Sequence, residues 1–124
     1  MKQLLIVGFG GFIGSVTRFI VQKLNVRLHF LSIPIGTLTV NILGSLLIGL
    51  IIGITAKTEI ISPNLRIFLM AGFCGGFTTF SSFTGENLTL MQNGQFASAL
   101  LYTGVSIVLG FLAVYLGYET SNLL

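Results

Sequence analysis

The chain has 124 residues, of which 53% are hydrophobic and only 7% are charged, with a net charge of +3. Soluble domains carry about a quarter charged residues, so the composition excludes an ordinary soluble domain and predicts a protein of the lipid bilayer. The single cysteine and single histidine exclude an intramolecular disulfide and a cysteine-based metal centre, and the few basic residues exclude a nucleic-acid surface. We do not expect an enzyme.

Four apolar segments follow one another along the chain, each long enough to provide the ~20 residues that cross a hydrocarbon core. The first has a long apolar run and no small-residue cleavage site, so we expect a helix rather than a signal peptide. Pro34 suits the start of the second helix, and Ser62 and Pro63 form an N-cap and first-turn pair for the third. We predict an all-α membrane protein with one four-helix transmembrane domain over residues 1–124, its helices covering approximately residues 3–22, 33–56, 64–91 and 96–118.

The positive charges between the segments do not favour one orientation in the membrane. With four spans both termini lie on one side, and the two sides carry similar charges: Lys2, Lys57 and Arg66 beside the termini, and Arg18, Lys23 and Arg27 at or near the other side. A weak topology signal is the simpler interpretation. The alternative is dual topology, with oppositely inserted chains paired as an antiparallel homodimer. A bundle this small cannot enclose a polar pathway alone, which favours the dimer.

The third segment contains the run GFCGGFTTFSSFTGE, from Gly72 to Glu86, which is unusual for a lipid-facing helix. Gly75 and Gly76 each lower helix propensity by about 1 kcal/mol, and two β-branched threonines follow them. The run predicts a broken helix at mid-membrane, where freed carbonyls must be covered by protein or water and suit a small cation. The alternative is an unbroken helix whose glycines line a close helix crossing.

After the glycines, Phe77, Phe80 and Phe83 recur at helical spacing and predict one aromatic stripe. The edges of aromatic rings carry partial positive charge, so such a stripe is able to line a path for an anion. Ordinary apolar packing is the alternative.

Polar residues of the second and fourth segments are expected in the same half of the membrane. Thr37 and Asn41 are four residues apart, as are Tyr102 and Ser106, so each pair shares a helix face. Threading the spans places both pairs opposite the termini, beside Ser81. Each residue alone could hydrogen-bond a neighbouring helix, at roughly 0.6 kcal/mol. Together they predict the lining of a narrow polar pathway.

Arg18 and Glu86 are expected in this half of the membrane too, near the headgroups. One interpretation is structural, with Arg18 reaching the interface and Glu86 pairing with Arg18, Lys23 or Arg27. The alternative is a charged vestibule that shapes ion access.

Three motifs, GGFTTFSSFTGE, GTLTVNILG in the second segment and GFGGFIGSVTR in the first, resemble the CrcB/Fluc family of fluoride channels, and the resemblance covers essentially the whole chain. It implies a fluoride-selective channel of the bacterial inner membrane that lowers cytoplasmic fluoride by passive export. It also implies an antiparallel dual-topology homodimer with two pores. A structural sodium ion would lie at the dimer interface, held by backbone carbonyls that correspond here to Gly75 and Thr78.

By the same resemblance, the family's fluoride pathway corresponds to a set of polar and aromatic residues, namely Asn41, Phe80, Ser81, Phe83, Thr37, Tyr102 and Ser106. A further position of the polar track, often a hydroxyl residue in the family, is Gly110 here, so water or a neighbouring side chain would substitute. Glu86 matches an acidic residue often found after the phenylalanines, whereas the resemblance does not settle the role of Arg18.

Two other functions stay open from the residues alone. A small dual-topology, proton-coupled drug antiporter would need a carboxylate deep in the membrane, for which Glu86 is the candidate. A non-transporting membrane scaffold would give no ion flux when purified and reconstituted.

Overall fold

The structure is a computed structural model that describes residues 1–27, 29–30 and 32–124. Within these residues, four helices are long and apolar enough to cross a membrane, and their bounds are Lys2–Gln22, Ile35–Lys57, Pro63–Gln92 and Phe96–Ser121. They lie within a few residues of the predicted spans, so the predicted helical, four-span architecture is confirmed.

The elements in chain order are α1 (Lys2–Gln22), α2 (Leu24–Arg27), β1 (His29–Phe30), β2 (Ile33–Pro34), α3 (Ile35–Lys57), α4 (Pro63–Ile67), the π-helix η1 (Phe68–Cys74), α5 (Gly75–Phe77), α6 (Phe80–Gln92) and α7 (Phe96–Ser121). The two short strands pair antiparallel and form a hairpin between α2 and α3. The cap predicted before the third span is confirmed, because the Ser62 side chain accepts a hydrogen bond from the Leu65 amide at 3.2 Å.

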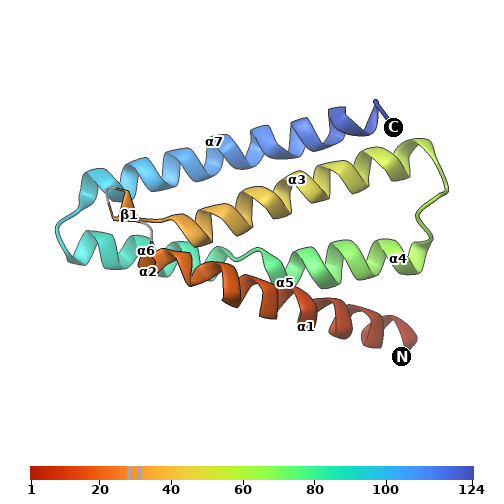
Figure 1. Cartoon of the computed structure of the whole chain (residues 1–124), viewed down its shortest axis with the longest axis horizontal. Helices are drawn as coiled ribbons and strands as arrows, with labels where there is room; N and C mark the ends of the chain where they lie inside the picture. The colour runs from red at the N-terminus through yellow and green to blue at the C-terminus, as the bar shows by residue number, and fades with distance from the viewer. Residues whose placement is uncertain (28, 31) are drawn as a thin grey trace.

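The long helices run along the long axis of the molecule, with α3 and α7 side by side and α1 against the third span (Figure 1). Both chain termini lie at one end of the bundle, and the α6–α7 turn and β1 lie at the other (Figure 1). Because α3 and α7 both begin at the end opposite the termini, they run parallel. Residues early in α3 therefore lie at the level of residues early in α7.

Glycines allow α1 to approach the third span closely. A Cβ atom on Gly10 would lie 2.6 Å from the Phe68 carbonyl oxygen, and one on Gly76 would lie 2.6 Å from the Gly11 carbonyl oxygen. Gly14 likewise abuts the backbone of η1. Small residues at such crossings let helix backbones pack directly in lipid, where no hydrophobic effect draws helices together.

The interior is small, and most large apolar side chains face outward, as expected for a protein whose solvent is lipid. A buried cluster of Ile33, Leu90, Ala99 and Tyr102 lies near the end opposite the termini. By contrast, phenylalanines such as Phe12 are well exposed. The cluster places Tyr102, which is fully buried, beside the polar groups described next.

Candidate functional site

The third span is interrupted at Thr78 and Thr79, whose backbones are extended (φ −83°, ψ 157° and φ −151°, ψ 119°). The predicted glycines, Gly75 and Gly76, are helical and belong to α5. The interruption therefore falls on the β-branched pair that follows them. Thr79 begins the next helix, since its hydroxyl oxygen accepts the Ser82 amide at 3.1 Å.

The interruption diverts two amides from their usual helical acceptors. In a continuous α-helix each amide donates to the carbonyl four residues earlier, so the Thr79 amide would donate to Gly75 and the Ser82 amide to Thr78. Instead, the Thr79 amide donates to Asn41 Oδ1 at 2.8 Å. The Ser82 amide donates to the Thr79 hydroxyl. The carbonyls of Gly75 and Thr78 therefore lack these two amide donors. Gly75 is exposed and Thr78 is half-buried.

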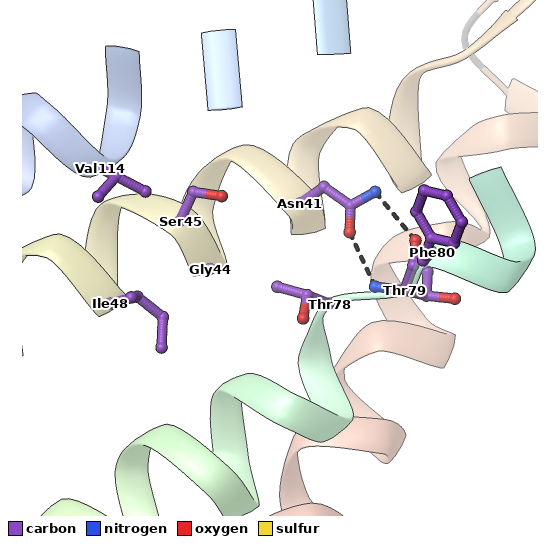
Figure 2. A pocket seen from close by; sticks show the side chains of 8 residues that line it. All are labelled: Asn41, Gly44, Ser45, Ile48, Thr78, Thr79, Phe80 and Val114. Carbon is purple, nitrogen blue, oxygen red and sulfur yellow. Dashed lines mark hydrogen bonds between the residues drawn. The ribbon is translucent and has the colours of Figure 1, made fainter. Parts of the chain in front are cut away.

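A cavity of about 300 Å³ lies between this interruption and α3 (Figure 2), and it is lined by Asn41, Gly44, Ser45, Ile48, Thr78, Thr79, Phe80 and Val114. A second cavity of about 280 Å³ shares two of these residues and is lined by Ser45, Ser106, Ile107, Gly110, Phe111 and Val114. The two cavities adjoin along the seam between α3 and α7.

One residue that lines the second cavity, Ser106, has a buried polar atom. Ser106 Oγ is buried, and among the described residues no group hydrogen-bonds to it. At Gly110, the position where the resemblance predicts a hydroxyl residue, an added Cβ would lie 4.0 Å from Ser45 Oγ. The hydroxyl that Gly110 lacks is therefore available nearby from the Ser45 side chain.

Aromatic rings continue from the first cavity toward the end opposite the termini. The ring centroids of Phe80 and Phe83 are 5.8 Å apart. Phe83 meets Tyr102 at 5.1 Å with a 66° interplanar angle, an edge-on contact. Phe77 does not extend this row, because it lies before the interruption and stacks on Phe73 instead. The predicted three-residue stripe is thus wrong for Phe77 and holds for the other two phenylalanines.

Glu86 is the centre of a hydrogen-bonded cluster. Its Oε2 accepts from Thr37 Oγ1 at 2.8 Å and from Asn25 Nδ2 at 3.0 Å, and its Oε1 accepts from the Tyr102 hydroxyl at 3.1 Å. Thr37 and Tyr102, predicted on sequence to lie together, are both fully buried. A carboxylate accepts such bonds strongly, so neutral donors from three elements hold Glu86 in place.

The predicted ion pair of Glu86 is wrong for Arg18 and Lys23. The hydrogen bonds that described side chains donate to Glu86 all come from neutral groups. Arg18 is half-buried, and Lys23 places its ammonium 5.4 Å from the centroid of the Phe19 ring. The side chain of Arg27 lies outside the described part of the chain. Among the described side chains, neutral donors hold Glu86 in place of Arg18 or Lys23.

Asn25 was not anticipated from the sequence. Its amide nitrogen donates to both Thr37 Oγ1 and Glu86, while its carbonyl oxygen accepts the Thr37 backbone amide at 3.0 Å. It therefore caps the first turn of α3 from the preceding segment. Asn25 lies in α2, well before the start of α3 at Ile35, so no capping pattern in the sequence marks it.

Two recesses flank this cluster. One, of about 460 Å³, is lined by Asn25, Ser32, Pro34, Glu86, Thr89, Leu90, Asn93 and Gln95. The other, of about 520 Å³, is lined by Phe19, Gln22, Lys23, Asn25, Ser82, Gly85, Glu86 and Thr89. Ser81 lies apart from all these spaces, on the exposed side of α6, with its hydroxyl 3.4 Å from that of Thr79.

These features define a small multi-pass membrane protein in which neutral polar groups and aromatic rings follow one seam beside an interrupted span. The chain belongs to the CrcB family, because residues 5–118 match the family described as CrcB-like protein, camphor resistance (CrcB). The family resemblance predicted from the motifs is thereby confirmed.

Similar proteins carry the name "Fluoride-specific ion channel FluC". The one from Azobacteroides pseudotrichonymphae is 46% identical over 118 residues, which cover 95% of this chain and 94% of that protein. The one from Chlorobium chlorochromatii is 49% identical over 115 residues, covering 93% and 88%. The one from Flavobacterium psychrophilum is 40% identical over 117 residues, covering 94% of each.

Proposed function

We propose that this chain forms a fluoride-selective ion channel of the bacterial inner membrane, which lowers cytoplasmic fluoride by passive export. Relatives named for this activity match nearly its whole length. The observation that carries the proposal is the seam itself, where amide, hydroxyl and ring-edge groups of Asn41, Ser106, Phe80 and Phe83 succeed one another. Fluoride enters cells as neutral HF and dissociates inside, so its export down a gradient needs no coupled energy.

Fluoride holds its hydration water strongly, so a pore must return hydrogen-bond donors where it strips water away. Ser106 offers a buried hydroxyl without a partner among the described residues, and an anion or a water that reached it would satisfy it. The edges of Phe80 and Phe83 add a weak positive field. None of these groups carries a fixed charge that would trap the ion, and conduction requires that no site hold it too tightly.

Thr37 and Tyr102 belong to the same proposed path, but their hydroxyls donate to Glu86. An anion that reaches them must therefore share these donors with the carboxylate. We assign Glu86 the role of ordering this end of the path, and Arg18 the vestibule beside it. Ser81 is exposed on the single chain, so its place in the path depends on a second subunit.

The working unit in this proposal is an antiparallel homodimer. Gly75 and Phe80, on either side of the interruption, are exposed on the single chain, and unpaired backbone groups at membrane depth are not tolerated against lipid. A second copy would cover them. Dual topology gives such a copy, and reporter fusions at the C-terminus should show both orientations in comparable amounts. Two lysines added to the Asn93–Gly94 turn should shift insertion to one orientation and lower activity.

A sodium ion fits the interruption on chemical grounds. Carbonyl oxygens are suitable ligands for such a cation, and Gly75 and Thr78 each have a carbonyl whose helical donor is diverted. The described residues place no cluster of His, Cys, Asp or Glu that would hold a metal. When bound, the ion would supply positive charge and cross-link the two subunits.

The proposal is tested with purified protein in liposomes loaded with fluoride or with chloride. A channel gives rapid fluoride efflux, negligible chloride efflux and no dependence on an imposed proton gradient. Efflux that requires a proton gradient and Glu86 would instead support a drug antiporter. No flux of either anion from well-assembled dimers would support a scaffold, and both of these results would overturn the proposal.

A further inference from the structure

Asn41 is bound on both sides of its amide by one residue of the third span. Its Nδ2 donates to the Thr79 carbonyl at 3.1 Å, and its Oδ1 accepts the Thr79 amide at 2.8 Å (Figure 2). The side chain thus pairs with the backbone as a neighbouring β-strand would. Thr79 is the extended, almost fully buried N-cap of α6. The pair therefore satisfies its buried amide, which has no helical acceptor here, and adds a second donor to its carbonyl, which already begins α6.

We infer that Asn41 is the residue that keeps the third span open and leaves the Gly75 carbonyl available to a cation. The reason is competition for one donor. The Thr79 amide is able to close the helix on Gly75 or to bond with Asn41, and the structure has the second arrangement. Gly75 and Gly76 are themselves helical. They weaken the helix, but the side chain of Asn41 supplies the alternative partner.

The same side chain faces the proposed anion path. Asn41 lines the cavity that also contains Phe80, and an amide group has two N–H donors. One N–H of Asn41 donates to the Thr79 carbonyl. This bond fixes the direction of the second N–H, which stays available for an ion in the cavity. Asn41 is therefore a positioning residue for the cation site and a donor to the anion path. The second role rests on the proposed fluoride channel, and the first rests on the proposed sodium site.

The inference is tested by following thermal unfolding of the purified dimer against sodium concentration, with N-methyl-D-glucamine as the replacement cation, beside fluoride efflux from liposomes. In the wild-type protein sodium should raise the unfolding temperature. Asn41→Ala should need at least tenfold more sodium for the same rise, because the Thr79 amide is free to close on Gly75. Thr39→Ala is the matched control on the same helix, since its hydroxyl donates only to the Ile35 carbonyl of α3.

Asn41→Asp separates this role from general damage to the fold. A carboxylate has two acceptors and no donor, so it repels the Thr79 carbonyl and should abolish the effect of sodium. The protonated acid has one donor and one acceptor, and acidic buffer should restore the effect relative to wild type in the same buffer. Asn41→Ala should gain nothing from acid.

The outcomes are distinguishable. Wild-type sodium dependence in Asn41→Ala, with loss of fluoride efflux alone, would reduce Asn41 to an anion donor and overturn the inference. A wild-type protein that conducts fluoride with an unfolding temperature indifferent to sodium would overturn it too, while the proposed function stands. A wild-type protein that responds to sodium but does not conduct fluoride would contradict the proposed function, and the sodium response of the variants would still decide the inference.

Discussion

The two halves of the third span are held by different interactions. Up to Phe77 the span lies against α1 through glycines, with backbone meeting backbone at Gly10, Gly14 and Gly76. After Thr79, α6 is joined to α3 and α7 by side-chain hydrogen bonds, several of which converge on Glu86. The first half should thus be sensitive to side-chain size and the second to side-chain chemistry. This division gathers the polar side chains in the second half, where the proposed ion path runs.

The largest effect is expected from steric change in the first half. In Gly14→Val the new side chain would enter the backbone of η1, whereas a Cβ on Gly8 meets nothing within 4 Å. Overpacking of this kind costs about 3 kcal/mol at the upper end of its usual range. Thermal unfolding in detergent should therefore show strong destabilisation for Gly14→Val and none for Gly8→Val. Equal stability of the two variants would contradict the packing described for this half.

A large effect on flux is expected from chemical change in the second half. Glu86→Gln keeps the shape but turns an NH₂ group toward either Tyr102 or Thr37, both of which donate. Hydrogen bonds to charged groups contribute about 1.5–3 kcal/mol, so we expect fluoride efflux to fall roughly tenfold or more. Glu119→Gln, an exposed site bonded to Asn122, should keep wild-type efflux. Matching efflux in both variants would show that the cluster does not order the path.

A moderate effect is expected from removing a ring edge. Phe80→Ile keeps the bulk but loses the positive ring edge and the ring contact with Phe83. Such an aromatic pair contributes about 0.5–1.5 kcal/mol, so efflux should fall by up to roughly tenfold. Phe12 is exposed on α1, away from the seam, and Phe12→Ile should leave efflux unchanged. A chloride leak in Phe80→Ile, with fluoride efflux intact, would assign the ring to exclusion rather than to passage.

The smallest effect is expected at Gly110, because an added Cβ there meets only Ser45 Oγ, at 4.0 Å. Gly110→Ser should fold normally and change fluoride efflux less than about twofold, because Ser45 already places a hydroxyl nearby. Combining it with Ser45→Ala should restore the efflux that Ser45→Ala alone loses. A failure of this rescue would show that the Ser45 hydroxyl does not substitute at this position.

Much of the fold could be predicted because apolar length determines it. The spans and the Ser62 cap follow from local composition, and Thr37 and Tyr102 meet because topology brings their helices to the same level. What was missed depends on tertiary partners. The glycines indicated where the third span is weak, but the partner of the Thr79 amide lies on α3. The hydrogen bond from Asn25 to Glu86 likewise joins residues 61 positions apart.

The most direct test of the central claim is the reversal potential of reconstituted protein with fluoride on one side of a planar bilayer and chloride on the other. The account predicts a reversal potential set by the fluoride gradient and unchanged by a pH difference across the bilayer. A reversal potential near the chloride equilibrium, or one that follows the pH difference, would contradict a neutral, fluoride-selective path along the α3–α7 seam.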